Sequence, residues 1–327
     1  MIEILSNPNW INPQIDFLLF LQNIRMSGFD IFNNLFLSIT IIGEFWLPMV
    51  ICAVVYWCID LRAGIYLFSL TTLNMFFAHL FKMIACVYRP WVLSDKIKPV
   101  EKALAIAAGY SFPSGHSAQA SATLGGLAFL LRKNFWFILV LILLVLLVGF
   151  SRLWLGVHTP QDVVVGICIG FSLVFFMNNV VNWAEKDTKR YLYLLGIINA
   201  AVISVLIFIC YFNHYPADYV DGKLLVDPRH SIQASIFCYG CIAGLLSGTF
   251  LCRRFFPFNP KSVNLKIRIF RGIIGSIMII LLCKCGIRYL FCDDCNFKIV
   301  YLMSFINGII ITAIYPYIFQ KLENLKS

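Results

Sequence analysis

Residues 134–183 read NFWFILVLILLVLLVGFSRLWLGVHTPQDVVVGICIGFSLVFFMNNVVNW. Two long apolar runs flank a short polar stretch that contains Arg152, His158 and Asp162. Each run has roughly the twenty residues that a helix needs to cross about 30 Å of hydrocarbon. The stretch therefore predicts two membrane-spanning helices, joined by a loop that places ionisable side chains at one membrane face.

The composition of the whole chain extends this prediction. Of the 327 residues, 60% are hydrophobic and only 13% are charged, and the mean hydropathy is +0.83. Soluble domains are nearer half apolar and a quarter charged, so we expect an integral membrane protein. The net charge of +10 does not indicate nucleic acid, because the 26 basic residues are scattered among short loops. The first residues lack a basic segment followed by an apolar one, so we expect no cleaved signal peptide.

Apolar runs recur along the chain and predict an all-α, polytopic transmembrane bundle of about nine spans. Residues 14–31 are apolar on one side only and predict a helix that lies in the membrane interface. No linker or internal repeat divides the chain, so we expect one membrane domain over 1–327. It would comprise a core at 33–183 and additional C-terminal helices at 191–327. The predicted spans are 33–57, 63–86, 114–131, 134–151, 162–183, 191–212, 232–252, 268–289 and 297–319.

The distribution of basic residues predicts the orientation of the chain. An odd number of spans places the two termini on opposite sides, and the loop at 253–271 alone carries six Lys and Arg residues. We therefore expect the N-terminus outside and the C-terminus in the cytoplasm, in a bacterial plasma membrane. An endoplasmic reticulum membrane with a lumenal site has the same topology and is the alternative.

The 12 cysteines do not indicate a disulfide scaffold, because most lie in apolar runs, where a thiol behaves as a small hydrophobe. Cys292 and Cys295 form a C-x-x-C in a short loop. Without a second ligand pair this is weak evidence for zinc, and a disulfide requires an oxidising compartment. A structural or incidental pair is the plainer interpretation.

Three polar segments stand out, and the nine-span topology places all three at the same membrane face. The first, KMIACVYRP, begins at Lys82 and contains Arg89 and Pro90. If the second span continues this far, the two cations project from one side of a helix and can bind a dianion. Pro90 then ends the helix. Snorkelling of two interfacial cations is the alternative.

The second segment, Pro113-Ser114-Gly115-His116, is expected to open a helix. Ser114 can cap the helix, Gly115 lets a ligand approach the backbone, and free N–H groups at a helix start form an anion site. His116 would lie beside the bound anion and could donate a proton to it. The alternative is a plain serine cap with an interfacial histidine.

The third segment, SRLWLGVHTPQD, covers residues 151–162. Its Thr-Pro pair is typical of a helix start, and Asp162 can complement the helix dipole. His158 precedes Asp162 by four residues, and a carboxylate on one imidazole nitrogen leaves the other nitrogen as a nucleophile. Arg152 adds a third cation.

The three segments together match the motifs K-x6-R-P, P-S-G-H and S-R-x5-H-x3-D without insertion. Over roughly residues 75–175 the chain thereby resembles the type 2 phosphatidic acid phosphatase superfamily. The resemblance implies a phosphatase that works through a phosphohistidine and uses no metal and no cofactor. It implies His158 as the nucleophile, Asp162 as its orienting partner and His116 as the acid. The implied phosphate-binding residues are Lys82, Arg89, Ser114, Gly115 and Arg152.

Outside these motifs the resemblance is less specific. The common form of the superfamily has about six spans, whereas this chain has three more predicted spans after the core. Residues 81–91 resemble the glucose-6-phosphatase branch, and residues 43–60 resemble sphingoid-base phosphate phosphatases. Neither likeness assigns a substrate. The loop at 213–231 is expected on the catalytic side, as a cover for the site or as a solvated connector.

Three functions fit these features. The first is a lipid phosphate or diphosphate phosphatase, because an interfacial site meets a head group while the tail stays in the bilayer. Undecaprenyl diphosphate, phosphatidic acid, phosphatidylglycerol phosphate and sphingoid-base phosphates are candidate substrates. The second is a phosphatase or phosphotransferase for a soluble ester such as a sugar phosphate. The third is a non-catalytic transporter or binding protein, which has no need for the His158–Asp162 pair. The expected partners are the bilayer and its lipid phosphate, without nucleic acid.

Overall fold

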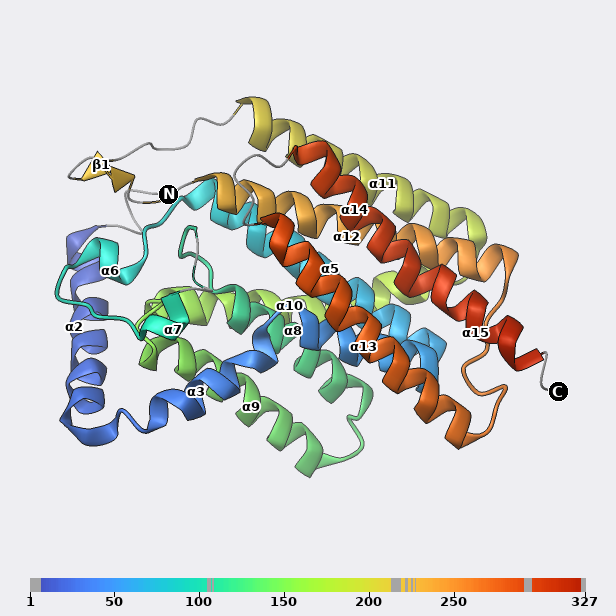
Figure 1. Cartoon of the computed structure of the whole chain (residues 1–327), viewed down its shortest axis with the longest axis horizontal. Coiled ribbons are helices and arrows are strands. Elements are labelled where there is room, and N and C mark those ends of the chain that lie inside the picture. Colours follow the sequence, from blue (N-terminus) through green and yellow to red (C-terminus); the bar gives the residue numbers. More distant parts are fainter. Residues whose placement is uncertain are drawn as a thin grey trace. The chain divides into compact units, whose positions relative to one another are not determined.

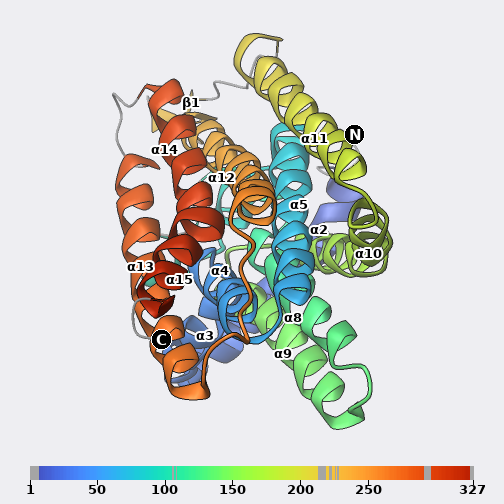
Figure 2. The same ribbon diagram turned by 90° about the vertical axis from the view of Figure 1, so that its right-hand side faces the viewer.

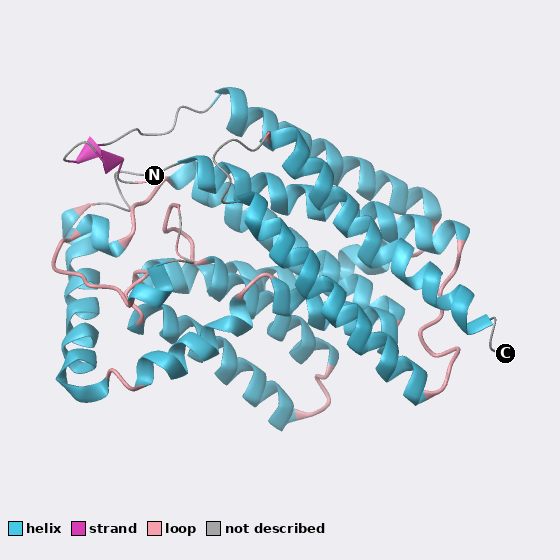
Figure 3. Cartoon of the chain, in the orientation of Figure 1, coloured by secondary structure: helices cyan, strands magenta, loops and turns pink. Residues whose placement is uncertain are grey.

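The computed structural model describes residues 7–104, 107, 109–212, 219–220, 223–224, 226, 228–290 and 296–324. Nearly all regular structure in these residues is helical (Figures 1 and 3), which confirms the predicted all-α class. The described part contains one short antiparallel pair of strands, β1 (Tyr219–Val220) and β2 (Lys223–Leu224).

The chain forms two compact units. Four helices contribute residues to both units: α5 (Leu61–Ala85), α10 (Pro160–Ala184), η4 (Phe208–Phe212) and α12 (Pro228–Phe255). Unit 1 comprises Met1–Glu44, Phe77–Ser172 and Phe212–Ile232, and unit 2 comprises Phe45–Phe76, Leu173–Tyr211 and Gln233–Ser327. The helices that begin in or before α10 are α2 (Pro8–Ile24), η1 (Arg25–Phe29), α3 (Phe32–Thr40), η2 (Ile41–Gly43), α4 (Trp46–Val54), η3 (Val55–Ile59), α5 (Leu61–Ala85), α6 (Pro90–Leu93), α7 (Glu101–Leu104), α8 (Gly115–Leu130), α9 (Phe135–Trp154) and α10 (Pro160–Ala184). The later helices are α11 (Thr188–Ile207), η4 (Phe208–Phe212), α12 (Pro228–Phe255), α13 (Leu265–Leu290), α14 (Phe297–Ile309), η5 (Ile310–Ile314) and α15 (Tyr315–Asn324).

Helix α8 is the buried centre of unit 1. Its sequence, GHSAQASATLGGLAFL, consists mainly of small residues, and most of them are buried. A Cβ added to Gly166 of α10 would lie 2.7 Å from the carbonyl oxygen of Ser114, and one added to Gly170 would lie 2.7 Å from the amide nitrogen of Ala122. Small residues thus let α10 approach the backbone of α8 closely, as in other membrane helix pairs. This contact brings the start of α10 next to the start of α8.

The N-terminal part of unit 1 turns sharply between α2 and α3 (Figure 1). Gly28 in η1 has φ +110°, a conformation that glycine adopts without steric cost. The buried guanidinium of Arg25 fixes the turn, because it donates to the carbonyl oxygens of Trp154, at 2.8 Å, and of Lys98. Helix α2 covers much of the predicted interfacial helix at 14–31. Its location in the membrane interface stays a prediction.

A glycine stripe organises part of unit 2. Gly240, Gly244 and Gly248 recur every four residues along α12 and meet α14 and η5, and Figure 2 shows α12 beside α14. A Cβ added to Gly244 would lie 2.0 Å from the carbonyl oxygen of Phe305. Larger side chains at these positions would therefore separate the helices.

Seven helices of the described part are long and apolar enough to cross a membrane, and the broken pair Phe32–Gly43 and Trp46–Ile59 can form an eighth span. This agrees with an integral membrane protein. Helix α8 coincides with the predicted span at 114–131. It has 16 residues and is therefore only about 24 Å long. The expected number of about nine spans stays a prediction.

Candidate active site

The start of α10 shows why His158 and Asp162 lie together. Pro160 is the first residue of α10, and Oδ2 of Asp162 accepts a hydrogen bond from the amide of Thr159 at 2.8 Å. This is a helix-capping contact, as the Thr-Pro pair predicted. The same oxygen lies 3.3 Å from Nδ1 of His158, and both side chains are buried. The carboxylate therefore caps the helix and orients the imidazole at once.

The other imidazole nitrogen of His158 faces a cation. Nη1 of Arg89 lies 2.8 Å from Nε2 of His158 and also donates to the carbonyl oxygen of Val157 at 3.0 Å. Since a guanidinium only donates, these contacts assign the imidazole proton to Nδ1 and the lone pair to Nε2. Burial, together with the nearby charges of Arg89, Lys82 and Arg152, holds the pKa of His158 well below its usual range. The neutral, nucleophilic form is thereby favoured.

Lys82 and Arg89 do not share a helix face, because the condition for it, a second span that continues to Arg89, is not met. Helix α5 ends at Ala85, Cys86 adopts a positive φ of 47°, and Arg89 is extended before α6 begins at Pro90. Pro90 therefore starts a short helix and does not end a long one. The two cations still converge on the loop at 109–111. Nζ of Lys82 donates to the carbonyl oxygens of residues 110 and 111 at 2.9 and 3.1 Å, and Nε of Arg89 donates to that of residue 109 at 3.1 Å.

Ser114, Gly115 and His116 open α8, as the sequence predicted. Ser114 is the N-cap, and its amide donates to the backbone carbonyl of Asp162 at 2.9 Å. A Cβ added to Gly115 would meet no atom within 4 Å, so there is free space beside the first turn of the helix. Among the described residues, buried Nε2 of His116 has no hydrogen-bond partner. The helix start thus combines open backbone amides with an unused imidazole nitrogen.

Arg152 lies at the end of α9 and is completely buried. Its Nη1 donates to Oγ1 of Thr40 at 2.7 Å, whereas its Nε has no hydrogen-bond partner in the described part of the chain. An unpaired buried donor is costly, so such a group indicates a place where a ligand supplies the acceptor. Arg152 and His116 both lie within electrostatic range of His158. All eight predicted site residues thus lie in unit 1, and contacts or electrostatic interactions connect five of them to His158: Lys82, Arg89, His116, Arg152 and Asp162.

Ser111 belongs to this cluster and was missed. It is fully buried, its hydroxyl donates to Oδ2 of Asp162 at 2.6 Å, and Oγ lies 3.3 Å from Nδ1 of His158. The available signal was its position, since Ser111 precedes the Pro113 motif by two residues and is a polar side chain in a mostly apolar stretch.

Other sequence features fall outside this cluster. Cys292 and Cys295 lie outside the described residues, as does most of the loop at 213–231. Ser231 ends the predicted loop but lies in the first turn of α12 in the structure. It accepts a hydrogen bond from the amide of Tyr110 at 3.3 Å and so contacts the loop that Lys82 and Arg89 hold. Among the described residues, no group of three or more His, Cys, Asp or Glu side chains is arranged to hold a metal ion.

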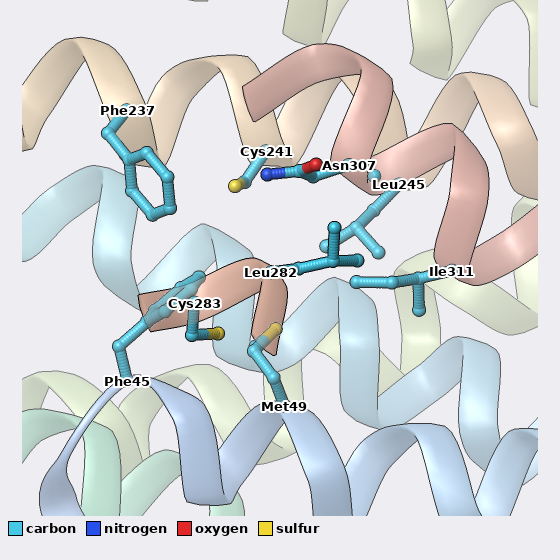
Figure 4. A pocket seen from close by; sticks show the side chains of 10 residues that line it. Phe45, Met49, Phe237, Cys241, Leu245, Leu282, Cys283, Asn307 and Ile311 are labelled. Carbon is cyan, nitrogen blue, oxygen red and sulfur yellow. The ribbon is translucent and has the colours of Figure 1, made fainter. Parts of the chain in front are cut away.

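Unit 2 contains a separate small cavity of about 20 Å³, shown in Figure 4. Asn307 is its one amide side chain, and room of this size accommodates about one water molecule. It includes none of the eight predicted site residues, and it is too small for a lipid chain. The remaining lining residues are Phe45, Met49, Phe237, Cys241, Leu245, Leu282, Cys283, Gly308 and Ile311.

Comparison with known families gives two matches along the chain. Residues 62–186 match the PAP2 superfamily, and residues 236–327 match the transmembrane extension of PAP2 superfamily phosphatases. The first match contains all eight predicted site residues. The second covers most of α12, including its glycine stripe, and the helices from α13 to α15. No solved structure matches the chain.

Curated relatives agree with these matches. Over 172 residues the chain is 27% identical to phosphatidylglycerophosphatase B of Bacillus subtilis, which covers 49% of this chain and 78% of the relative. Over 89 residues it is 41% identical to undecaprenyl-diphosphatase BcrC of B. subtilis, covering 26% of this chain and 45% of the relative. Over 66 residues it is 38% identical to an undecaprenyl-diphosphatase of Sulfolobus acidocaldarius, covering 20% of this chain and 31% of the relative. The predicted resemblance is thereby confirmed, and the chain belongs to the PAP2 superfamily of membrane phosphatases.

Proposed function

We propose that the protein hydrolyses the phosphate ester or diphosphate of a membrane lipid, with His158 as the nucleophile. One observation carries the proposal. His158 is buried with Nδ1 against the carboxylate of Asp162, at 3.3 Å, and Nε2 against the guanidinium of Arg89, at 2.8 Å. An imidazole oriented by a carboxylate and surrounded by cations is suited to attack a phosphorus atom and carry the phosphoryl group.

In the first step, the lone pair on Nε2 of His158 attacks phosphorus and the bond from phosphorus to the leaving oxygen breaks. Arg89 then has to release Nε2 and donate to a phosphoryl oxygen. His116 gives its proton to the leaving oxygen, so that the lipid departs as an alcohol or as a monophosphate. The carboxylate of Asp162 stabilises the positive charge on the phosphorylated imidazole.

In the second step, water attacks the phosphohistidine and the bond between phosphorus and Nε2 breaks. His116, now neutral, accepts a proton from the attacking water. Inorganic phosphate leaves, and His158 returns to its starting form. Proton and phosphoryl group are thus both accounted for over one turnover.

Charge stabilisation in both steps falls to Lys82, Arg89 and Arg152, with Ser114 and the amide of Gly115. Phosphoryl transfer depends mainly on positioning and on stabilising the charge of the equatorial oxygens. Three cations supply this stabilisation from the protein itself, Arg89 and Arg152 buried and Lys82 partly buried. We therefore propose that activity does not require a divalent metal ion and persists in EDTA.

The proposed substrate class follows from the relatives, which are named for phosphatidylglycerophosphate and undecaprenyl diphosphate. Lipids of this kind keep their tails in the bilayer while the phosphate enters unit 1. We further propose that the site faces the outer side of a bacterial plasma membrane, with α2 in the interface. The basic loop at 253–271, which favours the cytoplasm, supports this orientation.

The test uses the full chain purified in detergent. Phosphate release is measured from phosphatidylglycerol phosphate, undecaprenyl diphosphate, phosphatidic acid and glucose 6-phosphate, each with and without EDTA. The variants are His158→Ala and, as a matched pair of arginines, Arg152→Ala and the exposed Arg132→Ala. Acid-labile, base-stable labelling from a radioactive substrate reports the phosphohistidine.

We expect lipid substrates to be preferred, activity to persist in EDTA, and labelling to disappear with His158→Ala. Arg152→Ala should lose activity, while Arg132→Ala should not. Full activity of His158→Ala would exclude the mechanism, and preference for glucose 6-phosphate would exclude the lipid class. Inactivity toward every phosphate ester would leave a binding protein or transporter.

A further inference from the structure

We infer that Thr40 and Gly43 are positioning residues of the active site, although both precede the region that matches the PAP2 superfamily. Each lies against a different proposed catalytic group of unit 1. Thr40 holds Arg152, and Gly43 supports the backbone of His116. The inference rests on the proposed function, since it assigns these two residues a role in that reaction.

Thr40 ends α3 and is completely buried. Its Oγ1 accepts the hydrogen bond from Nη1 of Arg152 at 2.7 Å. In the described part of the chain Nε of Arg152 has no hydrogen-bond partner, and the carboxylate of Glu44 is a nearby opposite charge. The direction of a fixed guanidinium determines which phosphoryl oxygen it reaches, so the Thr40 hydroxyl aims Nε of Arg152 at the substrate.

Gly43 lies in η2, three residues after Thr40. A Cβ at this position would lie 2.5 Å from the carbonyl oxygen of His116 and 2.9 Å from its Cα. These are backbone atoms, so a side chain on residue 43 displaces the first turn of α8. The absence of a side chain thereby lets η2 support α8 at the residue that is proposed to protonate the leaving oxygen.

The two contacts predict different kinetic defects. Loss of the Thr40 contact misdirects Arg152, which acts on the phosphoryl group whatever the leaving group is. Displacement of His116 matters when the leaving oxygen needs a proton, as in an alkyl phosphate. It matters less for 4-nitrophenyl phosphate, because nitrophenolate departs without a proton.

The experiment compares Thr40→Val, Thr40→Ser and Gly43→Ala with two controls in the full chain. Ser38→Ala lies on the same helix, and its hydroxyl bonds only within that helix, to the carbonyl oxygen of Asn34. Gly196→Ala adds a Cβ where nothing lies within 4 Å. For each protein kcat, KM, vanadate inhibition and the thermal midpoint are measured, with a lipid phosphate and with 4-nitrophenyl phosphate.

We expect Thr40→Val to lower kcat/KM about tenfold with both substrates and to weaken vanadate inhibition by a similar factor, since one bond to a charged group is lost. Thr40→Ser keeps the hydroxyl and should therefore retain the activity that Thr40→Val loses. Gly43→Ala should lower kcat/KM, which reports the first step, more with the lipid than with the aryl ester, and both controls should match the unmodified protein.

Normal kinetics of Thr40→Val with unchanged thermal stability would overturn the role of Thr40. An equal loss of kcat/KM with both substrates in Gly43→Ala would overturn the link to His116. If Gly43→Ala fails to fold, His116→Ala provides the leaving-group comparison and Thr40→Val still tests the inference. These outcomes differ from failure of the proposed function, which full activity of His158→Ala would reveal.

Discussion

Replacing Asp162 by Asn tests the central pair of the proposed mechanism. Asparagine has nearly the shape of aspartate, and its amide oxygen can still accept from the Ser111 hydroxyl and the Thr159 amide, which lie 2.6 and 2.8 Å from Oδ2. Helix α10 therefore keeps its cap. What is lost is the negative charge beside His158.

The magnitude follows from the distance. A unit charge 3.3 Å from the imidazolium interacts with it by about 5 kcal/mol at the effective dielectric constant of about 20 that suits buried sites. Since about 1.4 kcal/mol changes a rate tenfold, we expect kcat to fall by about a thousandfold to ten-thousandfold. A similar loss, about ten-thousandfold, follows the corresponding Asp-to-Asn change in a serine protease triad. KM should not rise, because Lys82, Arg89 and Arg152 remain.

The assay measures steady-state phosphate release and the amount of phosphohistidine after rapid quenching. Asp187→Asn is the matched control, because exposed Asp187 caps α11 through a hydrogen bond to the amide of Lys189 at 3.1 Å, which Asn can also make. A kcat of Asp162→Asn within tenfold of the unmodified protein, at an unchanged thermal midpoint, would refute the pairing.

Three further predictions concern the site and the fold. Ser111→Ala should lower kcat about tenfold while Ser111→Thr retains activity, and Ser121→Ala, whose hydroxyl bonds only within α8, should be normal in the same phosphate-release assay. Because the pKa of His158 is lowered, its neutral form persists as the pH falls below about 6.5. The test measures kcat/KM against pH with two substrates whose phosphate groups have different pKa values. The fall of kcat/KM at acid pH that both substrates share should lie below about pH 6.5, and a shared fall at or above that pH contradicts the assignment. Glu323→Gln should cost about 3 to 5 kcal/mol, seen as a lower thermal midpoint, because it leaves the buried charge of Arg271, 2.5 Å away, unpaired. Combining it with Arg271→Met should recover most of that loss, and no recovery would argue against the ion pair.

The local sequence was sufficient to predict a residue's structural role where the partner of that residue is near it in the chain. Ser114 as a helix cap, Pro160 as the first residue of a helix and Asp162 four residues after His158 are all short-range patterns, and the structure has each of them. Helix α5 ends at Ala85, close to the predicted end of the second span at residue 86, and the conditional continuation to Arg89 does not occur for a local reason that residue types did not reveal. Cys86 leaves the helix with a positive φ.

The long-range contacts were invisible in the sequence. Thr40 lies in an apolar run, and nothing near it indicates that it holds Arg152, 112 residues later. Ser111 reaches Asp162 across 51 residues in the same way. The division into a core at 33–183 and added helices at 191–327, and the outward orientation of the site, stay predictions.

The sequence by itself determined the membrane class, the helical fold and the eight candidate residues, because hydropathy and short motifs are properties of neighbouring residues. The tertiary structure decided how those residues meet. Glycines of α10 bring two helix starts together, two cations hold the loop at 109–111, and Thr40 and Gly43 support Arg152 and His116. Such contacts depend on close packing between distant segments, where a single added methyl group is felt, and no local pattern records them.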